Sequence, residues 1–256
     1  MPARYAELRC RTCFSFLEGA SHPEELVGRA AELGLSALAI ADVNGLYGIV
    51  RAHAAAKKIG LPLVVGAEVT VGELGPGRPG RVILLAMDRD GYGNLCRVVT
   101  AAHGGLPAAD GSVPLRREPG HVLVPFRELA ERARGVFALY AGADGEAAER
   151  LHEAFGRRFA LAVARHRVAG EEARIAAARA IGRRLRIPVA ITNDVHTHDR
   201  RRQVLQDVLA CVRLGTTVER AGRRLFPNAE RTLKGPEEMA RLWSDFPEGL
   251  AAAVEI

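Results

Sequence analysis

Asp194 and His196 are the residues whose types and spacing are best suited to chemistry. They follow a short apolar run at 187–190 and precede a helical pattern at 200–213, so we place them at a strand end, where α/β proteins gather functional side chains. Residues two apart on extended backbone point the same way, and a carboxylate beside an imidazole suits Zn or Mn. The alternative is a turn in which Asp194 caps the next helix and His196 is an ordinary surface histidine.

Polar residues also follow three other apolar runs that we predict to be strands: Asp42, Glu68 and His166. About seven such strands alternate with helical patterns, which predicts a parallel sheet closed, or nearly closed, into a barrel. An open doubly wound sheet is the alternative. In an open sheet, the polar residues would gather at one switch point, but in this sequence they follow many strands, which favours the barrel.

Two further motifs carry weaker signals. Cys10 and Cys13 form a C-x-x-C, but a zinc ribbon needs a second pair, and a thioredoxin-like pair should open a helix. Residues 75–80 match G-x-G-x-x-G, yet two prolines lie inside the motif and a predicted strand follows it, so we interpret it as a hairpin-like turn. The Gly- and Pro-rich stretch at 103–119 predicts an exposed loop.

The composition is that of a globular chain with a basic balance. Its 256 residues suffice for one large α/β domain or two small ones, and 36 basic against 30 acidic residues give a net charge of +6. That charge is compatible with a nucleic-acid partner. No apolar run reaches the roughly 18 residues of a membrane span, and the N-terminus has no signal-peptide core. Four scattered cysteines indicate reduced thiols, so we expect a cytoplasmic protein with no membrane partner.

Several motifs, in order along nearly the whole chain, resemble those of a PHP domain. They are LRCRTCFSFLEG at 8–19, AIAD at 39–42, GAE at 66–68, GYGNL at 91–95 and TNDVH at 192–196. More narrowly, the chain is similar to the N-terminal PHP domain of bacterial C-family DNA polymerases, the polymerase III alpha subunits. Residues 19–26, 50–53 and 205–209 are closest to the error-prone, damage-inducible branch.

This resemblance implies an α/β fold, a distorted (βα)7 PHP barrel at 1–215, with 216–256 as a connecting segment toward a polymerase palm that this chain lacks. It implies a module of an error-prone, translesion DNA polymerase, in which Mg in the absent palm supports DNA-directed nucleotidyl transfer. The implied partners are the rest of the polymerase chain and DNA through the full protein. Other damage-response polymerase subunits and a sliding clamp are further candidates.

In some family members the barrel crevice binds up to three metals and has phosphoesterase or proofreading activity. Glu68, His166, Asp194 and His196 stand where the family has ligands, and Glu18 stands where it usually has an acid. Four expected histidines are replaced, by Arg9, Arg11, Val43 and Arg81.

Arginine is a permanent cation that cannot bind a metal and that pairs with carboxylates. We therefore predict that Arg9, Arg11 and Arg81 occupy vacated metal positions and neutralise Glu18, Glu68 and Asp194, with Asp42 as a further crevice acid. No residue is then catalytic and there is no proofreading. A single Zn or Mn on Asp194, His196 and His166 is the alternative.

Two other functions compete with a polymerase module. A free-standing metal-dependent PHP phosphoesterase or nuclease would need intact ligands, and Arg9, Arg11 and Val43 argue against it. A plain nucleic-acid-binding module has the charge, but aromatic residues make up only 5% of the chain, so a stacking platform is lacking.

Overall fold

The computed structural model describes residues 3–75, 78–104 and 122–256. Most of the loop predicted at 103–119, and two residues of the turn predicted at 75–80, lie outside these ranges. Of the helices in the described residues, none is long and apolar enough to cross a membrane.

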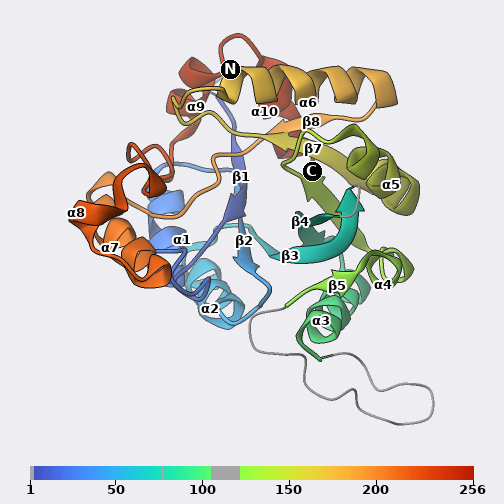
Figure 1. Cartoon of the computed structure of the whole chain (residues 1–256), viewed down its shortest axis with the longest axis horizontal. Coiled ribbons are helices and arrows are strands. Elements are labelled where there is room, and N and C mark those ends of the chain that lie inside the picture. Colours follow the sequence, from blue (N-terminus) through green and yellow to red (C-terminus); the bar gives the residue numbers. More distant parts are fainter. Residues whose placement is uncertain (1–2, 76–77, 105–121) are drawn as a thin grey trace.

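One curled sheet forms the centre of the molecule, with the helices arranged outside it (Figure 1). Its two ends come together beyond β8, where Cys10 and Val195 form a parallel bridge. The predicted α/β barrel is therefore confirmed as a distorted, curled sheet. In spatial order, the strands are β1 (Ala6–Cys10), β2 (Ala37–Val43), β3 (Leu63–Gly75), β4 (Arg78–Ala86), β6 (Val136–Tyr140), β7 (Phe159–Val163) and β8 (Val189–Ile191), and β5 (Val124–Pro125) pairs with β3.

The sheet is not wholly parallel, which corrects the sequence-based expectation. Strand β4 runs antiparallel to both of its neighbours, β3 and β6, whereas the other pairings are parallel. The reason is the short connection between β3 and β4. Two strands joined by a tight turn can only pair antiparallel, because a parallel pair needs a long crossover.

Most of the helices form where apolar residues recur with helical spacing, and they bury that side against the sheet. In α6, for example, Ile175 and Ala178 are buried. Helix α2 ends at Gly60, whose φ of 73° is left-handed and suits glycine. The helices are α1 (Pro23–Glu32), α2 (Ile49–Ile59), α3 (Arg89–Gly104), α4 (Phe126–Glu131), α5 (Gly145–Phe155), α6 (Glu171–Leu185), α7 (Gln203–Leu214), α8 (Val218–Ala221), α9 (Pro236–Leu242) and α10 (Pro247–Glu255).

Residues 216–256 pack directly on the barrel. Helix α10 lies against β8 and β1, and the side chains of Trp243, Phe246 and Leu250 belong to the same hydrophobic core as the strands. A bridge between Thr197 and Thr232 holds the segment beside the end of β8. The boundary at 215 between barrel and connecting segment stays a prediction about the longer chain.

Candidate functional site

Arg9 and Arg11 are placed by the end of β1. They are two residues apart on extended backbone, so both side chains project from the same side of the strand. The Cys10–Val195 bridge holds this end of β1 beside the segment that carries Asp194. Both arginines therefore meet two acids, Glu68 in β3 and Asp194 in the segment after β8.

Glu68, in β3, is completely buried and is held by two guanidinium groups. Arg9 binds it in a fork, with Nε 3.0 Å from Oε2 and Nη2 2.9 Å from Oε1. Arg11 Nη2 donates to Oε2 at 2.6 Å. Burial raises the pKa of Glu68, but the charges of Arg9 and Arg11 outweigh it and hold that pKa well below its usual range. Glu68 is therefore ionised and fully paired.

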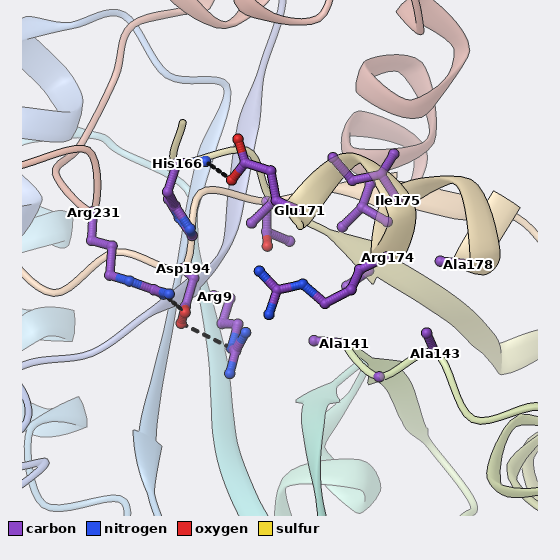
Figure 2. Close-up of a pocket in the computed structure, with 15 residues that line it drawn as sticks. Arg9, Ala141, Ala143, His166, Glu171, Arg174, Ile175, Ala178, Asp194 and Arg231 are labelled. Carbon is purple, nitrogen blue, oxygen red and sulfur yellow. Dashed lines mark hydrogen bonds and ion pairs between the residues drawn. The ribbon is translucent and has the colours of Figure 1, made fainter. Parts of the chain in front are cut away.

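Asp194 is shared among three arginines. Its Oδ1 accepts from Arg11 Nη1 at 2.8 Å and lies 3.2 Å from Arg9 Nε, while Oδ2 accepts from Arg231 Nη1. Figure 2 shows Arg9 and Arg231 converging on this carboxylate. The helical turn that follows is capped by Asp199, which accepts from the backbone of Arg201. The alternative role of Asp194 as a helix cap is therefore wrong.

His196 is buried, so it is not the surface histidine of that alternative interpretation. Its Nδ1 lies 2.7 Å from the backbone carbonyl of Glu18, which can only accept, so Nδ1 carries the proton. The lone pair on Nε2 then accepts from Arg11 Nη1. Burial, followed by the charge of Arg11, lowers the pKa of His196 to about 3, and the imidazole is neutral at pH 7.

His166 follows β7 and lines the same pocket as Asp194 (Figure 2). Its Nε2 donates to the carbonyl of Asn193 at 2.9 Å, and its backbone N donates to Glu171 at 2.7 Å. Burial and the charge of Arg231 lower the pKa of His166 to about 3. The ring therefore supports the Asn193–Asp194 backbone as a neutral group.

Glu18 extends the same set of contacts outward. Arg81 binds it in a fork at 3.0 and 3.1 Å, and Arg213 Nη1 lies 3.4 Å from its Oε1. We call the whole set the ion-pair cluster: Arg9, Arg11, Arg81, Arg213, Arg231, Glu18, Glu68 and Asp194.

Asp42 is buried close by but serves another purpose. It accepts from the backbone and hydroxyl of Thr12 at 2.7 and 2.8 Å and from the hydroxyl of Ser15 at 2.6 Å. Burial raises the pKa of Asp42 despite these bonds. Its direct contacts organise the loop after β1 and involve none of the arginines of the ion-pair cluster.

Three residues of the site were not foreseen from the sequence: Arg213, Phe226 and Arg231. Phe226 packs edge-on against His196, with ring centroids 5.1 Å apart, and the Arg231 guanidinium lies 4.4 Å above the Phe226 ring. All three come from α7 or the segment after it. Their local sequence did not assign them to the site, because Arg213 and Arg231 look like the other arginines around them and distant contacts alone bring Phe226 to His196.

The residues present do not fit a metal centre. The single lone pair on Nε2 of His196 already accepts from Arg11. The carboxylates of Glu68 and Asp194 already accept N–H groups from guanidinium cations, which would repel a metal ion at the same place. Within the part of the chain that the structure describes, no group of three or more His, Cys, Asp or Glu could hold a metal ion.

Fold and site together define a PHP-type barrel whose crevice is occupied by ion pairs. The sequence model of the PHP domain matches residues 7–176, so the chain belongs to the PHP family. An error-prone DNA polymerase from Anaeromyxobacter sp. (strain K) is 75% identical over 253 residues, which is 99% of this chain and 22% of that protein. One from Methylococcus capsulatus is 40% identical over 243 residues, 94% of this chain and 22% of that protein. The chain thus spans about a fifth of the length of these relatives.

A solved structure shares the fold. An amidohydrolase from Chromobacterium violaceum, with bound sulfate and no metal, has a TM-score of 0.53 and 18% sequence identity, covering 75% of this chain and 87% of that one. At this identity the likeness establishes the architecture alone.

Proposed function

We propose that the chain is the N-terminal module of a longer error-prone DNA polymerase and acts there as a scaffold without hydrolytic activity. Relatives named error-prone DNA polymerase match 99% and 94% of this chain, and the match covers 22% of their own length. This supports the assignment of the chain to a module of a longer polymerase. The ion-pair cluster supports the second half and is the observation that carries it. A multinuclear hydrolytic site needs metals to activate water, and guanidinium groups cannot do so.

The test is metal analysis combined with a hydrolysis assay. The purified chain, equilibrated with Zn or Mn and then desalted, should retain less than stoichiometric metal. It should also leave a phosphodiester substrate and single-stranded DNA uncleaved. Stoichiometric metal together with cleavage that a chelator abolishes would instead support the free-standing phosphoesterase or nuclease.

In the longer protein, a palm domain would carry out DNA-templated nucleotidyl transfer with Mg. We place that activity in translesion synthesis during DNA replication and repair after DNA damage, in the cytoplasm. Other damage-response polymerase subunits and a sliding clamp are the expected partners. A primer-extension assay on damaged and undamaged templates, using the full-length protein, tests the activity. Failure to extend either template would contradict it.

The outer face of α7 supports packing against the rest of that longer chain. Val204, Val208 and Val212 are 73%, 44% and 61% exposed and follow one another at four-residue intervals, so they form one apolar stripe. Exposed apolar stripes of this kind mark interaction sites. We assign the stripe to a segment of the remaining polymerase chain, because relatives continue for several times the length of this chain.

Hydrogen exchange tests this assignment directly. Backbone amides of α7 should exchange more slowly in the full-length protein than in the 256-residue chain. Helix α5, which packs on the sheet through Leu151 and Phe155, serves as the internal reference and should not change. Equal exchange of α7 in both proteins would contradict the packing.

A further inference from the structure

A groove between α6 and α10 lies at the beginning of β8, whereas the ion-pair cluster lies beyond the end of that strand. The groove has a volume of about 480 Å³ and shares no lining residue with the pocket beside Asp194. Figure 1 shows α6, α10 and β8 together at one edge of the barrel. The groove is therefore a separate feature of the fold.

The floor of the groove is apolar. Ile187 and Phe246 line it and are only 7% and 5% exposed, and Val189 is half-buried beside them. Ala251 and Ala252 supply the wall on α10, where their small side chains leave room for another group. Removing apolar surface from water is favourable, so this floor favours a ligand that carries apolar side chains.

Charged side chains of both signs border the apolar floor. Arg179 and Arg183 come from α6, and Glu248 and Glu255 come from α10. The Arg179 guanidinium lies 4.1 Å from the centre of the Phe246 ring and 3.8 Å from Glu248. Over residues 3–75, 78–104 and 122–256, the side chains of Arg183 and Glu255 make no ion pair or hydrogen bond. An apolar centre with a polar rim is the anatomy of a protein interface, whereas a nucleic-acid strand would need a positive surface.

The groove lies along α10 up to its last residue, Glu255, directly before Ile256. Between Glu248 and Glu255 the helix rises about 10 Å, at about 1.5 Å per residue. An extended segment covers that distance with about three residues, at about 3.3 Å each. Chain that continues from Ile256 would therefore reach the groove within a few residues.

The size of the groove favours a segment of the same chain over a separate protein. Eleven residues line it, whereas each side of a stable interface between separate proteins contributes about 20–30 residues. A tethered segment needs less contact, because a short linker holds it at a local concentration on the order of millimolar. The relatives are several times longer than their match to this chain, so the proposed polymerase module would have such a segment.

We propose that this groove binds the segment that directly follows Ile256 in the longer polymerase. Apolar side chains of that segment cover Phe246 and Val189, and its polar groups face Arg183 and Glu255. The inference rests on the proposed function, in which this chain is the N-terminal module of a longer protein. Together with the stripe on α7, the groove gives the module two separate attachments to the remaining polymerase chain.

Hydrogen exchange, followed by mass spectrometry, tests the proposal in two unaltered proteins. Backbone amides at 187–189 and in α10 should exchange more slowly in the full-length protein than in the 256-residue chain. The amides that directly follow Ile256 should also be protected in the full-length protein. Slower exchange at the groove without protection of the following segment would identify another part of the polymerase and overturn the assignment.

A substitution that fills the groove separates direct binding from an indirect effect. Ala251 is exposed, so Ala251→Trp should fold without repacking the core and should not lower the melting temperature of the 256-residue chain. In the full-length protein, the tryptophan should displace the segment, and the amides after Ile256 should exchange about tenfold faster or more. The matched control is Ala54→Trp, at an exposed alanine of α2 outside the groove, which should leave this exchange unchanged.

Two results overturn the proposal. One is equal exchange at 187–189 and in α10 in the two unaltered proteins, a comparison that does not depend on any variant. The other is an Ala251→Trp full-length protein in which the segment after Ile256 stays as protected as in the unaltered protein. Primer extension separates this failure from that of the proposed function. A full-length protein that extends primers but leaves the groove uncovered refutes only the docking of this segment.

Discussion

Replacing Arg11 with methionine tests whether the ion-pair cluster holds the barrel together. Methionine keeps much of the aliphatic volume but removes the guanidinium that contacts Glu68 at 2.6 Å and Asp194 at 2.8 Å. Arg11 is only 3% exposed. Removing one partner of a buried ion pair costs about 3–5 kcal/mol, because the other charge is left unpaired. Arg9 still contacts both carboxylates, so we expect the lower end, about 3 kcal/mol.

Urea denaturation at pH 7 measures this loss through the fluorescence of Trp243, the single tryptophan of the chain. A decrease of about 3 kcal/mol is large against the roughly 5–15 kcal/mol by which domains are stable. The matched control is Arg127→Met. Arg127 is 90% exposed and pairs with Glu131 one helical turn away, a contact worth about 0.3–0.5 kcal/mol.

A second substitution identifies the cause of the loss. Adding Glu68→Gln to Arg11→Met removes a carboxylate that has lost a partner, so the double variant should be more stable than the sum of the two single effects predicts. A coupling of about 0.5–3 kcal/mol is typical of contacting residues. A loss below about 1 kcal/mol for Arg11→Met, or strict additivity with Glu68→Gln, would refute the reasoning.

Three further outcomes follow from the same contacts. His166 and His196 have pKa values of about 3 in the folded chain, so below about pH 6.5 the unfolded chain binds more protons than the folded chain. The free energy of unfolding should therefore decrease as the pH is lowered, by about 1.4 kcal/mol per pH unit for each histidine. Urea denaturation from pH 5 to 7 should show a weaker pH dependence in the variant with both residues changed to Gln. Changing Arg9 and Arg11 together to His should free the carboxylates of Glu68 and Asp194 and raise the amount of Zn or Mn that the chain retains after desalting. Unchanged metal content would contradict the idea that these arginines prevent metal binding. Trp243→Ala should cost about 3–5 kcal/mol in thermal denaturation, because this side chain is fully buried, and a loss under 1 kcal/mol would show that α9 and α10 are not part of the core.

Local patterns in the sequence were sufficient to predict the α/β class of the fold and the protein family. Apolar runs alternating with helical spacing predicted the elements, and successive motifs from residue 8 to residue 196 predicted the PHP family, which the family match confirms. The two-residue spacing of Arg9 and Arg11 also determined that both side chains leave β1 on one side, since this follows from extended backbone alone.

Tertiary structure decided what meets those side chains. The turn at 75–80 concerned only β3 and β4, and the antiparallel pairing of β4 with β6 depends on which strand packs on the other edge of β4, which an alternation of predicted elements does not contain. Arg231 reaches Asp194 only because residues 216–256 fold back over the crevice. In sequence, a buried arginine of the cluster and a solvated surface arginine are identical. Burial and counter-charge distinguish them, and both arise only when distant segments pack together.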